Sequence, residues 1–176
     1  MVFLKKREVE NVVLNKVRKD KGIIYGARAV NRRFGILSRP TEDYDIFSIN
    51  PKKIANSTQV ELDNVVGFDY FYMKPGVHKG TYKVKGNGDD LIRGTKDDEG
   101  VADFTKMPRP SPKFDVVNGI RYRKISEEIK AKRMSLRDKN YKFRHDKDRQ
   151  DLNRIRSMIK ASRLWNNKVY LNTKNL

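Results

Sequence analysis

The sequence has no cysteine and two histidines among its 176 residues. Without cysteine, disulfides, thiolate nucleophiles and cysteine-based zinc sites are excluded, and two histidines leave little for an imidazole metal cage. Any bound metal is therefore expected to have oxygen ligands. No apolar run approaches the ~20 residues that cross a bilayer, and residues 1–7 lack the apolar stretch of a signal peptide. We expect no membrane partner and a cytoplasmic, intracellular protein.

Acidic residues are also scarce relative to basic ones, at 22 against 40, which gives a net charge of +18. Residues 1–120 hold 22 basic and 16 acidic side chains, whereas residues 121–176 hold 18 and 6. Two thirds of the excess charge therefore lies in the last third of the chain. With 37% apolar residues the chain can still bury a core. The composition indicates one folded domain with a phosphate-rich partner.

The first half of the chain alternates between helical and strand patterns. Helices are expected up to Asp20, over 27–34 and from Pro51 onward, the last with Ile54, Leu62 and Val65 as its buried stripe. Strands are expected over 23–25 and 43–49. The pattern indicates an α+β fold, with a mixed β-sheet flanked by helices.

The second half begins with a mixed stretch over 67–80, whose end is read as loop. Strands over 81–84, 91–93 and 101–105 then suggest an antiparallel meander. Residues 108–112 form a linker, and Asn118-Gly119 predicts a type I′ hairpin. Helices are expected over 126–137 and 146–163. We expect a core over 1–122, a basic helical part over 123–164 packed on it, and a tail over 165–176, all in one domain.

Asp43 and Asp45 form the most informative pair of residues. On a strand, residues two apart face the same side, so both carboxylates point together. Hard cations such as Mg²⁺ prefer oxygen ligands and share them with substrate phosphates. Backbone N–H groups after Gly26 suit a phosphate, whose charge Arg28 and Arg39 could neutralise. Without this context, Asp-x-Asp is usually a solvated strand end.

Asp103 is a single acid inside an otherwise apolar strand, Val101 to Thr105. A carboxylate in such a place costs stability unless it is paired, hydrogen-bonded or bound to metal. Asp103 is therefore the candidate third carboxylate of the site. The alternative is a strand residue that faces solvent or caps a neighbouring turn.

The order of these parts resembles the nucleotidyltransferase superfamily typified by DNA polymerase β. The small abortive-infection-type and viral nucleotidyltransferase-like proteins are the closest in pattern, since Arg39 and Thr41 precede the aspartate pair. A basic helix reading Lys147-Asp148-Arg149-Gln150-Asp151-Leu152 is similar to the one that ends the family's domain. The chain departs from the pattern at Ala27, where Gly or Ser is usual, and in its longer loop from 26 to 43.

The resemblance implies transfer of a nucleoside monophosphate from a nucleoside triphosphate to an acceptor hydroxyl, with release of pyrophosphate. The acceptor is expected to be RNA with a tRNA-like end, and the cofactor Mg²⁺ or Mn²⁺. The catalytic and metal-binding residues are then Asp43, Asp45 and Asp103. The residues expected to bind the nucleotide are Gly26, Ala27, Arg28, Arg39, Thr41 and Lys147.

Two alternatives stay open. Lys147 either reaches the triphosphate or is an exposed helical lysine paired with Asp151. Residues 121–164, with Tyr141 and Phe143 among their cations and Trp165 directly after them, favour a nucleic-acid contact over a merely solvated helical face. If the site is inactive, the chain is instead a catalytically silent nucleotidyltransferase-like protein that binds nucleic acid or serves a structural role in a virus.

Overall fold

The computed structural model describes residues 6–34 and 43–172, and the side chains of residues 7–34 and 43–163. The chain divides into two compact units, one of residues 1–29 and 40–124 and the other of residues 30–39 and 125–176. None of the helices in the described part of the chain combines the length and the apolar character needed to span a bilayer.

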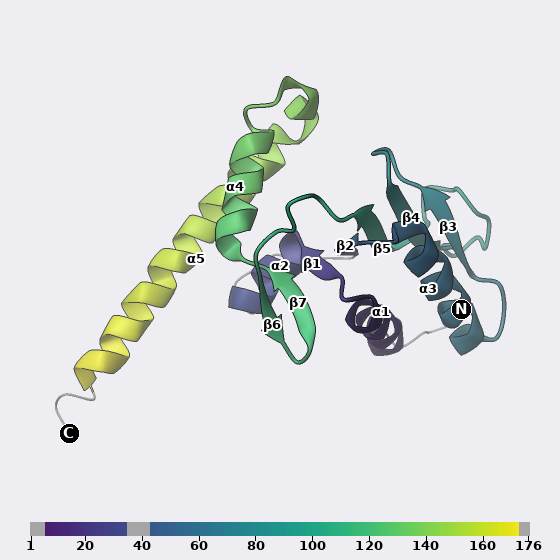
Figure 1. Ribbon diagram of the computed structural model, residues 1–176, viewed down its shortest axis with the longest axis horizontal. Coiled ribbons are helices and arrows are strands. Elements are labelled where there is room, and N and C mark those ends of the chain that lie inside the picture. Colours follow the sequence, from purple (N-terminus) through teal and green to yellow (C-terminus); the bar gives the residue numbers. More distant parts are fainter. Residues whose placement is uncertain (1–5, 35–42, 173–176) are drawn as a thin grey trace. The chain divides into compact units, whose positions relative to one another are not determined.

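The first unit contains a seven-stranded mixed sheet with the strand order β3-β4-β5-β2-β1-β7-β6 (Figure 1). Strand β2 pairs parallel to β5 and antiparallel to β1, and β1 pairs parallel to β7. The strands are β1 (Ile23–Tyr25), β2 (Tyr44–Ser48), β3 (Phe71–Pro75), β4 (Thr81–Gly86), β5 (Glu99–Lys106), β6 (Phe114–Val117) and β7 (Ile120–Arg123).

Helices α1 (Lys6–Asp20) and α3 (Pro51–Val66) supply the helical side of the first unit's core. Pro51 starts α3 because its fixed φ suits the first helical position, and Gly67 ends the helix in a left-handed conformation. Ile54 and Leu62 are buried as predicted. Val65 is 46% exposed, so its placement in the buried stripe is wrong. The core on the sheet side comprises Ile24, Tyr44, Ile46, Phe71, Val84, Val101, Ala102, Phe104 and Ile120.

The predicted meander exists but uses a different strand. Residues 91–93 belong to no strand, and Leu91 has a φ of 57°, a left-handed value that a strand does not allow. The first strand of the meander is instead β3, within the stretch whose end was expected to be loop. The type I′ hairpin is confirmed, because Asn118 and Gly119 both have positive φ values of 51° and 75° between β6 and β7.

The second unit contains α4 (Ile125–Ser135), the 3₁₀ helix η2 (Lys139–Arg144) and α5 (His145–Asn172), and the last part of α2 (Ala27–Phe34) contributes to it. Ile155 and Met158 form its core with Val30. Helix α5 continues to Asn172, so the tail predicted after Trp165 is helical up to that residue.

An ion-pair network joins α4 to α5 inside the second unit. Lys132 Nζ lies 3.3 Å from Asp148 Oδ1 and 2.7 Å from Asp151 Oδ2, and Arg144 Nε lies 3.2 Å from Asp148 Oδ2. The Asp148-x-x-Asp151 spacing places both carboxylates on the helix face that meets Lys132. Burial alone raises the pKa of Asp148, but the Ser135 hydroxyl and the charges of Lys132 and Arg144 outweigh it and lower that pKa.

Candidate active site

Four polar side chains form a row across four adjacent strands of the sheet. Asp45 on β2 is in register with Tyr25 on β1 and with Asp103 on β5, and Asp103 is in register with Lys83 on β4. Residues next to these in sequence, such as Ile46 and Phe104, belong to the core. Because successive strand residues point to opposite faces, the row lies on the face turned away from α1 and α3, called the site face below.

Asp45 and Asp103 are direct neighbours on parallel strands, where backbones run about 4.8 Å apart. Asp43 lies two residues before Asp45 and next to Gly100 at the start of β5, where a side chain on that glycine would meet the Asp43 Cβ at 3.6 Å. Strand β2 begins at Tyr44, so Asp43 lies just before the strand rather than within it as predicted, and a shared face for Asp43 and Asp45 stays a prediction. Strand β5 brings Asp103 to the same face from more than fifty residues away in the sequence.

The turn between β1 and α2 brings the backbone directly against Asp45. Gly26 has a φ of 70°, and a Cβ there would collide with the Asp45 carboxylate. Glycine is therefore needed both for the left-handed backbone and for the close approach. Helix α2 begins at the next residue, Ala27, so the carboxylate lies beside the positive end of the helix dipole.

Asp103 is held by Lys83, a residue that the sequence motifs did not identify. Lys83 Nζ donates to Asp103 Oδ2 at 2.5 Å, and the two side chains are 34% and 19% exposed. Burial raises the pKa of Asp103, the Lys83 ammonium opposes that rise, and the negative charge of Asp43 adds to it. The balance leaves the pKa of Asp103 above its ordinary value. A carboxylate of raised pKa is a better proton acceptor than an ordinary one.

Tyr25 closes the row on the other side of Asp45. Its ring stacks on Phe47 with centroids 3.9 Å apart, and its hydroxyl lies 3.3 Å from Thr105 Oγ1. Burial raises the pKa of Tyr25, and the charge of Asp45 raises it further. The phenol is therefore neutral at physiological pH. It supplies an O–H group at the edge of the acidic centre.

Arg28 contacts groups at the Asp43 end of the site. Its Nε donates to the Asp43 carbonyl oxygen at 3.3 Å, and its guanidinium lies over the Tyr44 ring at 4.0 Å, with Glu10 at 3.6 Å. Tyr44 belongs to the core side of β2, so these contacts turn the guanidinium away from the site face. Arg28 supports the backbone of Asp43, and its contact with a triphosphate stays a prediction.

A recess of about 630 Å³ borders this end of the site. Arg28 and Lys96 are its cations, and its four acidic side chains are Glu10, Asp97, Asp98 and Glu99. Its acids outnumber its cations, so this recess, like the three aspartates of the site face, repels a triphosphate unless a cation is bound.

The remaining residues predicted to bind the nucleotide are Arg39, Thr41, Lys147 and Ala27. Arg39 and Thr41 lie outside the described residues. Lys147 is exposed on α5 in the second unit, and its role toward a nucleotide stays a prediction. Ala27 lies at the first position of α2, as expected for a turn that leads into a helix.

The donor set fits a hard cation by its chemistry. Asp43, Asp45 and Asp103 offer only oxygen atoms, and Asp45 and Asp103 are neighbours across two strands. In the part of the chain that the structure describes, no three Asp, Glu or His side chains converge into a ready metal cluster. Lys83 already neutralises Asp103. A bound cation has to compete with that ammonium for the carboxylate.

Comparison with solved structures identifies the architecture. The polyadenylate synthase of Megavirus matches 86% of this chain with a TM-score of 0.69 at 17% sequence identity. The chain has a nucleotidyltransferase-like fold. It spans 31% of the length of that viral protein. No protein-family model matches the sequence, and comparison with curated proteins gives no match.

Two Helicobacter pylori structures also match part of the chain. JHP933 matches 79% of this chain and 58% of its own, with a TM-score of 0.47 at 15% identity. A candidate nucleotidyltransferase matches 72% of this chain and 55% of its own, with a TM-score of 0.46 at 16% identity.

Lys83 and Tyr25 are the site residues that motif reasoning missed. The alternation of Thr81, Lys83 and Lys85 with the core residue Val84 could have placed Lys83 on the polar face of its strand. Its pairing with Asp103 depends on the register between β4 and β5, which no local pattern records.

Proposed function

We propose that the chain is a metal-dependent nucleotidyltransferase that moves a nucleoside monophosphate from a nucleoside triphosphate to an acceptor hydroxyl. The observation that carries the proposal is the register of Asp45 with Asp103 beside the Gly26 turn, within a nucleotidyltransferase-like fold. This arrangement joins oxygen ligands for a cation to a helix start suited to phosphate.

The reaction assigns a task to each group. The acceptor oxygen attacks the α-phosphorus, its bond to that phosphorus forms as the bond to the bridging oxygen breaks, and pyrophosphate leaves. The acceptor proton passes to the Asp103 carboxylate. Asp43, Asp45 and Asp103 are the proposed ligands of Mg²⁺ or Mn²⁺, which when bound stabilises the charge on the attacking and leaving oxygens.

Lys83 and the β1–α2 turn orient the reactants. Backbone N–H groups at the start of α2 bind the triphosphate, and Gly26 permits the close approach. Lys83, which pairs with Asp103, is the cation of the row that would neutralise a phosphate oxygen.

The proposed acceptor is an RNA hydroxyl and the proposed nucleotide is ATP. The solved structure with a TM-score of 0.69 is described as a polyadenylate synthase, and the name of that activity supports both proposals. The excess of basic side chains after residue 120 supports a polyanionic acceptor.

The test incubates the full chain with labelled ATP, Mg²⁺ or Mn²⁺ and short RNA, and measures label attached to RNA. The double variant Asp45→Asn, Asp103→Asn is expected to lose at least about 100-fold in rate, because it removes charged groups that act in the transition state. Asp115→Asn is the matched control, since it neutralises a 62% exposed carboxylate on β6 of the same sheet. Equal rates in all three proteins, or no transfer by wild type with any nucleotide, refute the proposal.

A catalytically silent nucleic-acid-binding protein is the second candidate. The neutralisation of Asp103 by Lys83 and the alanine at position 27 favour it. Salt-sensitive RNA binding with no metal-dependent nucleotide binding, unchanged in the double variant, is the outcome that supports this function instead.

A further inference from the structure

In the second unit, most basic side chains are exposed and most acidic side chains are buried or half-buried. Of the thirteen Lys and Arg side chains in residues 125–163, eleven are exposed, whereas Asp146 is the one exposed acid among six. Asp148 and Asp151 are taken up by Lys132 in the contact between α4 and α5. Two of the six acids therefore form ion pairs with a buried lysine and add little negative charge to the surface. Among the described residues 125–163, the exposed charged side chains are therefore almost all cationic.

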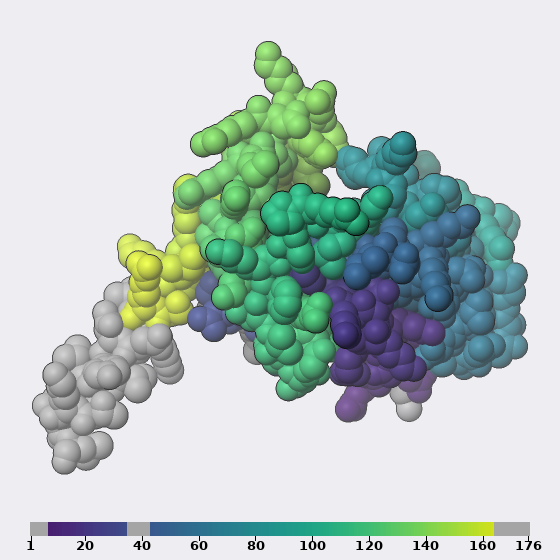
Figure 2. Space-filling view, viewed as in Figure 1, coloured from purple at the N-terminus to yellow at the C-terminus, as the bar shows by residue number. Residues whose placement is uncertain are grey.

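The segment from the end of α4 through η2, residues 134–144, is called the α4–η2 turn below. Local hydrogen bonds hold it in place. The His145 Nε2 atom lies 2.9 Å from the Ser135 carbonyl oxygen and 3.2 Å from that of Asp138, so the start of α5 is tied to the end of α4. The Asp138 side chain caps η2 by accepting from the Asn140 N–H at 2.9 Å. The turn thus presents its side chains from an ordered backbone. Figure 2 shows it at the surface in green to light green.

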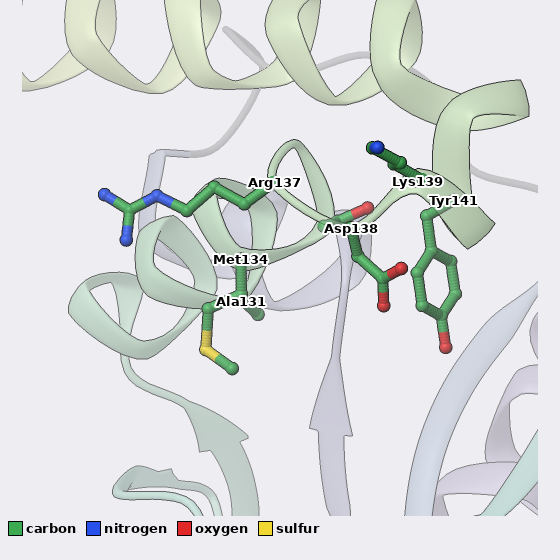
Figure 3. A pocket seen from close by; sticks show the side chains of 7 residues that line it. Ala131, Met134, Arg137, Asp138, Lys139 and Tyr141 are labelled. Atoms are coloured by element: carbon green, nitrogen blue, oxygen red, sulfur yellow. The ribbon is translucent and has the colours of Figure 1, made fainter.

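This turn carries apolar and aromatic side chains where solubility calls for polar ones. Phe143 is 79% exposed and Met134 is 60% exposed. The Tyr141 and Phe143 rings are 6.4 Å apart and tilted by 35°. A hollow of about 900 Å³ lies against the turn, and Met134, Asp138 and Tyr141 are among the residues that line it. In Figure 3, Arg137 extends away from Tyr141.

The residues in and around the hollow suit two chemically different parts of a ligand. The Asp138 carboxylate in the hollow disfavours a phosphate there, whereas Met134 and the Tyr141 ring suit a flat, uncharged ring. Arg137 and Lys139 also line the hollow and are exposed, and Lys142 beyond it is exposed as well. These cations suit phosphates. A base flanked by its own phosphates matches both parts.

We propose that the α4–η2 turn, residues 134–144, binds single-stranded nucleic acid by stacking an unpaired base on Tyr141 and Phe143 while Arg137, Lys139 and Lys142 contact its phosphates. In a duplex the bases are already stacked and paired, so the aromatic rings have nothing to bind. That the bound strand is also the acceptor rests on the proposed function. The binding itself does not.

The experiment measures the affinity of the full chain for a fluorescent single-stranded RNA, for the same sequence as a duplex, and for anionic lipid vesicles. Phe143→Ala and Tyr141→Ala are each expected to weaken single-strand binding by about 5- to 100-fold. Duplex binding is expected to stay within about 2-fold, because it depends on phosphate contacts alone. Phe68→Ala is the matched control, a 42% exposed phenylalanine in the first unit. Circular dichroism verifies that each variant is folded.

Charge is tested separately from stacking. The double variant Arg137→Gln, Lys139→Gln is expected to reduce the slope of log affinity against log salt by about 1.4 for a single strand. The control Lys52→Gln, Lys53→Gln removes two exposed charges from α3 and is expected to leave the slope unchanged.

Three outcomes overturn the inference: unchanged single-strand affinity in both aromatic variants, equal loss for single strand and duplex, or vesicle binding that these variants abolish while RNA binding persists. The Asp45→Asn, Asp103→Asn variant is expected to bind RNA as wild type does. Loss of transfer in that variant and loss of binding in Phe143→Ala are separate readouts, so either proposal can fail alone.

Discussion

Replacing Gly26 with alanine tests how closely the β1–α2 turn approaches Asp45. The new Cβ meets two obstacles, a left-handed backbone with a φ of 70° and the Asp45 carboxylate itself. Gly67 offers the matched comparison. Its φ is 83°, and a Cβ there has no neighbour within 4 Å.

The two costs can be assigned separately. A left-handed conformation costs a residue with a Cβ about 1–2 kcal/mol, so Gly67→Ala is expected to lower the free energy of unfolding by that amount. Gly26→Ala adds the displacement of Asp45 from its preferred rotamer, about 0.5–1.5 kcal/mol. Its total is therefore expected to be about 1.5–3.5 kcal/mol.

Urea unfolding followed by circular dichroism measures both substitutions in wild type and in an Asp45→Ala background. Removing the carboxylate should bring the cost of Gly26→Ala down to that of Gly67→Ala, whose own cost should not change. If Gly26→Ala costs the same with and without the Asp45 carboxylate, the close approach of the turn to Asp45 is refuted.

Three further substitutions probe the buried charges by the same unfolding measurement. Lys132→Ala should lower the free energy of unfolding by about 3–5 kcal/mol, because it leaves Asp148 and Asp151 without their shared cation. Lys130 is exposed, and Lys130→Ala should lower it by under about 0.5 kcal/mol. Similar losses in the two variants contradict the network. Asp148 has a lowered pKa, so its ionised form stabilises the fold above about pH 4. Asp148→Asn should therefore be less stable than wild type at pH 7, and the difference in unfolding free energy should close as the pH falls through the pKa of the folded state. Asp103 has a raised pKa, so its ionised form destabilises the fold and Asp103→Asn should be more stable than wild type at pH 7. The difference in unfolding free energy should close below about pH 4, where Asp103 is protonated in both states. An Asn variant less stable than wild type at pH 7 contradicts that direction.

Local patterns predicted several elements of the first unit. The helix from Pro51, the strand around Asp45 and the Asn118-Gly119 hairpin follow from short-range rules of capping, alternation and turn geometry, and the structure confirms them. The strand expected over 91–93 failed because a single residue, Leu91, adopts a left-handed φ.

The pairing of residues distant in sequence could not be predicted in this way. Strand β5 lies between β2 and β4, so Asp103 meets Asp45 on one side and Lys83 on the other. The lone acid in an apolar strand indicated that Asp103 needs a partner, and the identity of that partner depends on sheet order. The surroundings of Arg28 also depend on the fold: its guanidinium lies over the Tyr44 ring, and its contact with a triphosphate stays a prediction.

The central position of β5 has a consequence for the synthesis of the chain. Strands β2 and β4 both precede β5 in sequence, and both pair with it. As the chain emerges, each of them keeps an unpaired edge until residue 106 has been made, and unpaired edges attract other chains. Asp103 lies in the middle of the strand that closes both edges. Its charge interrupts the apolar run from Val101 to Phe104, and a charge within such a run lowers its tendency to aggregate.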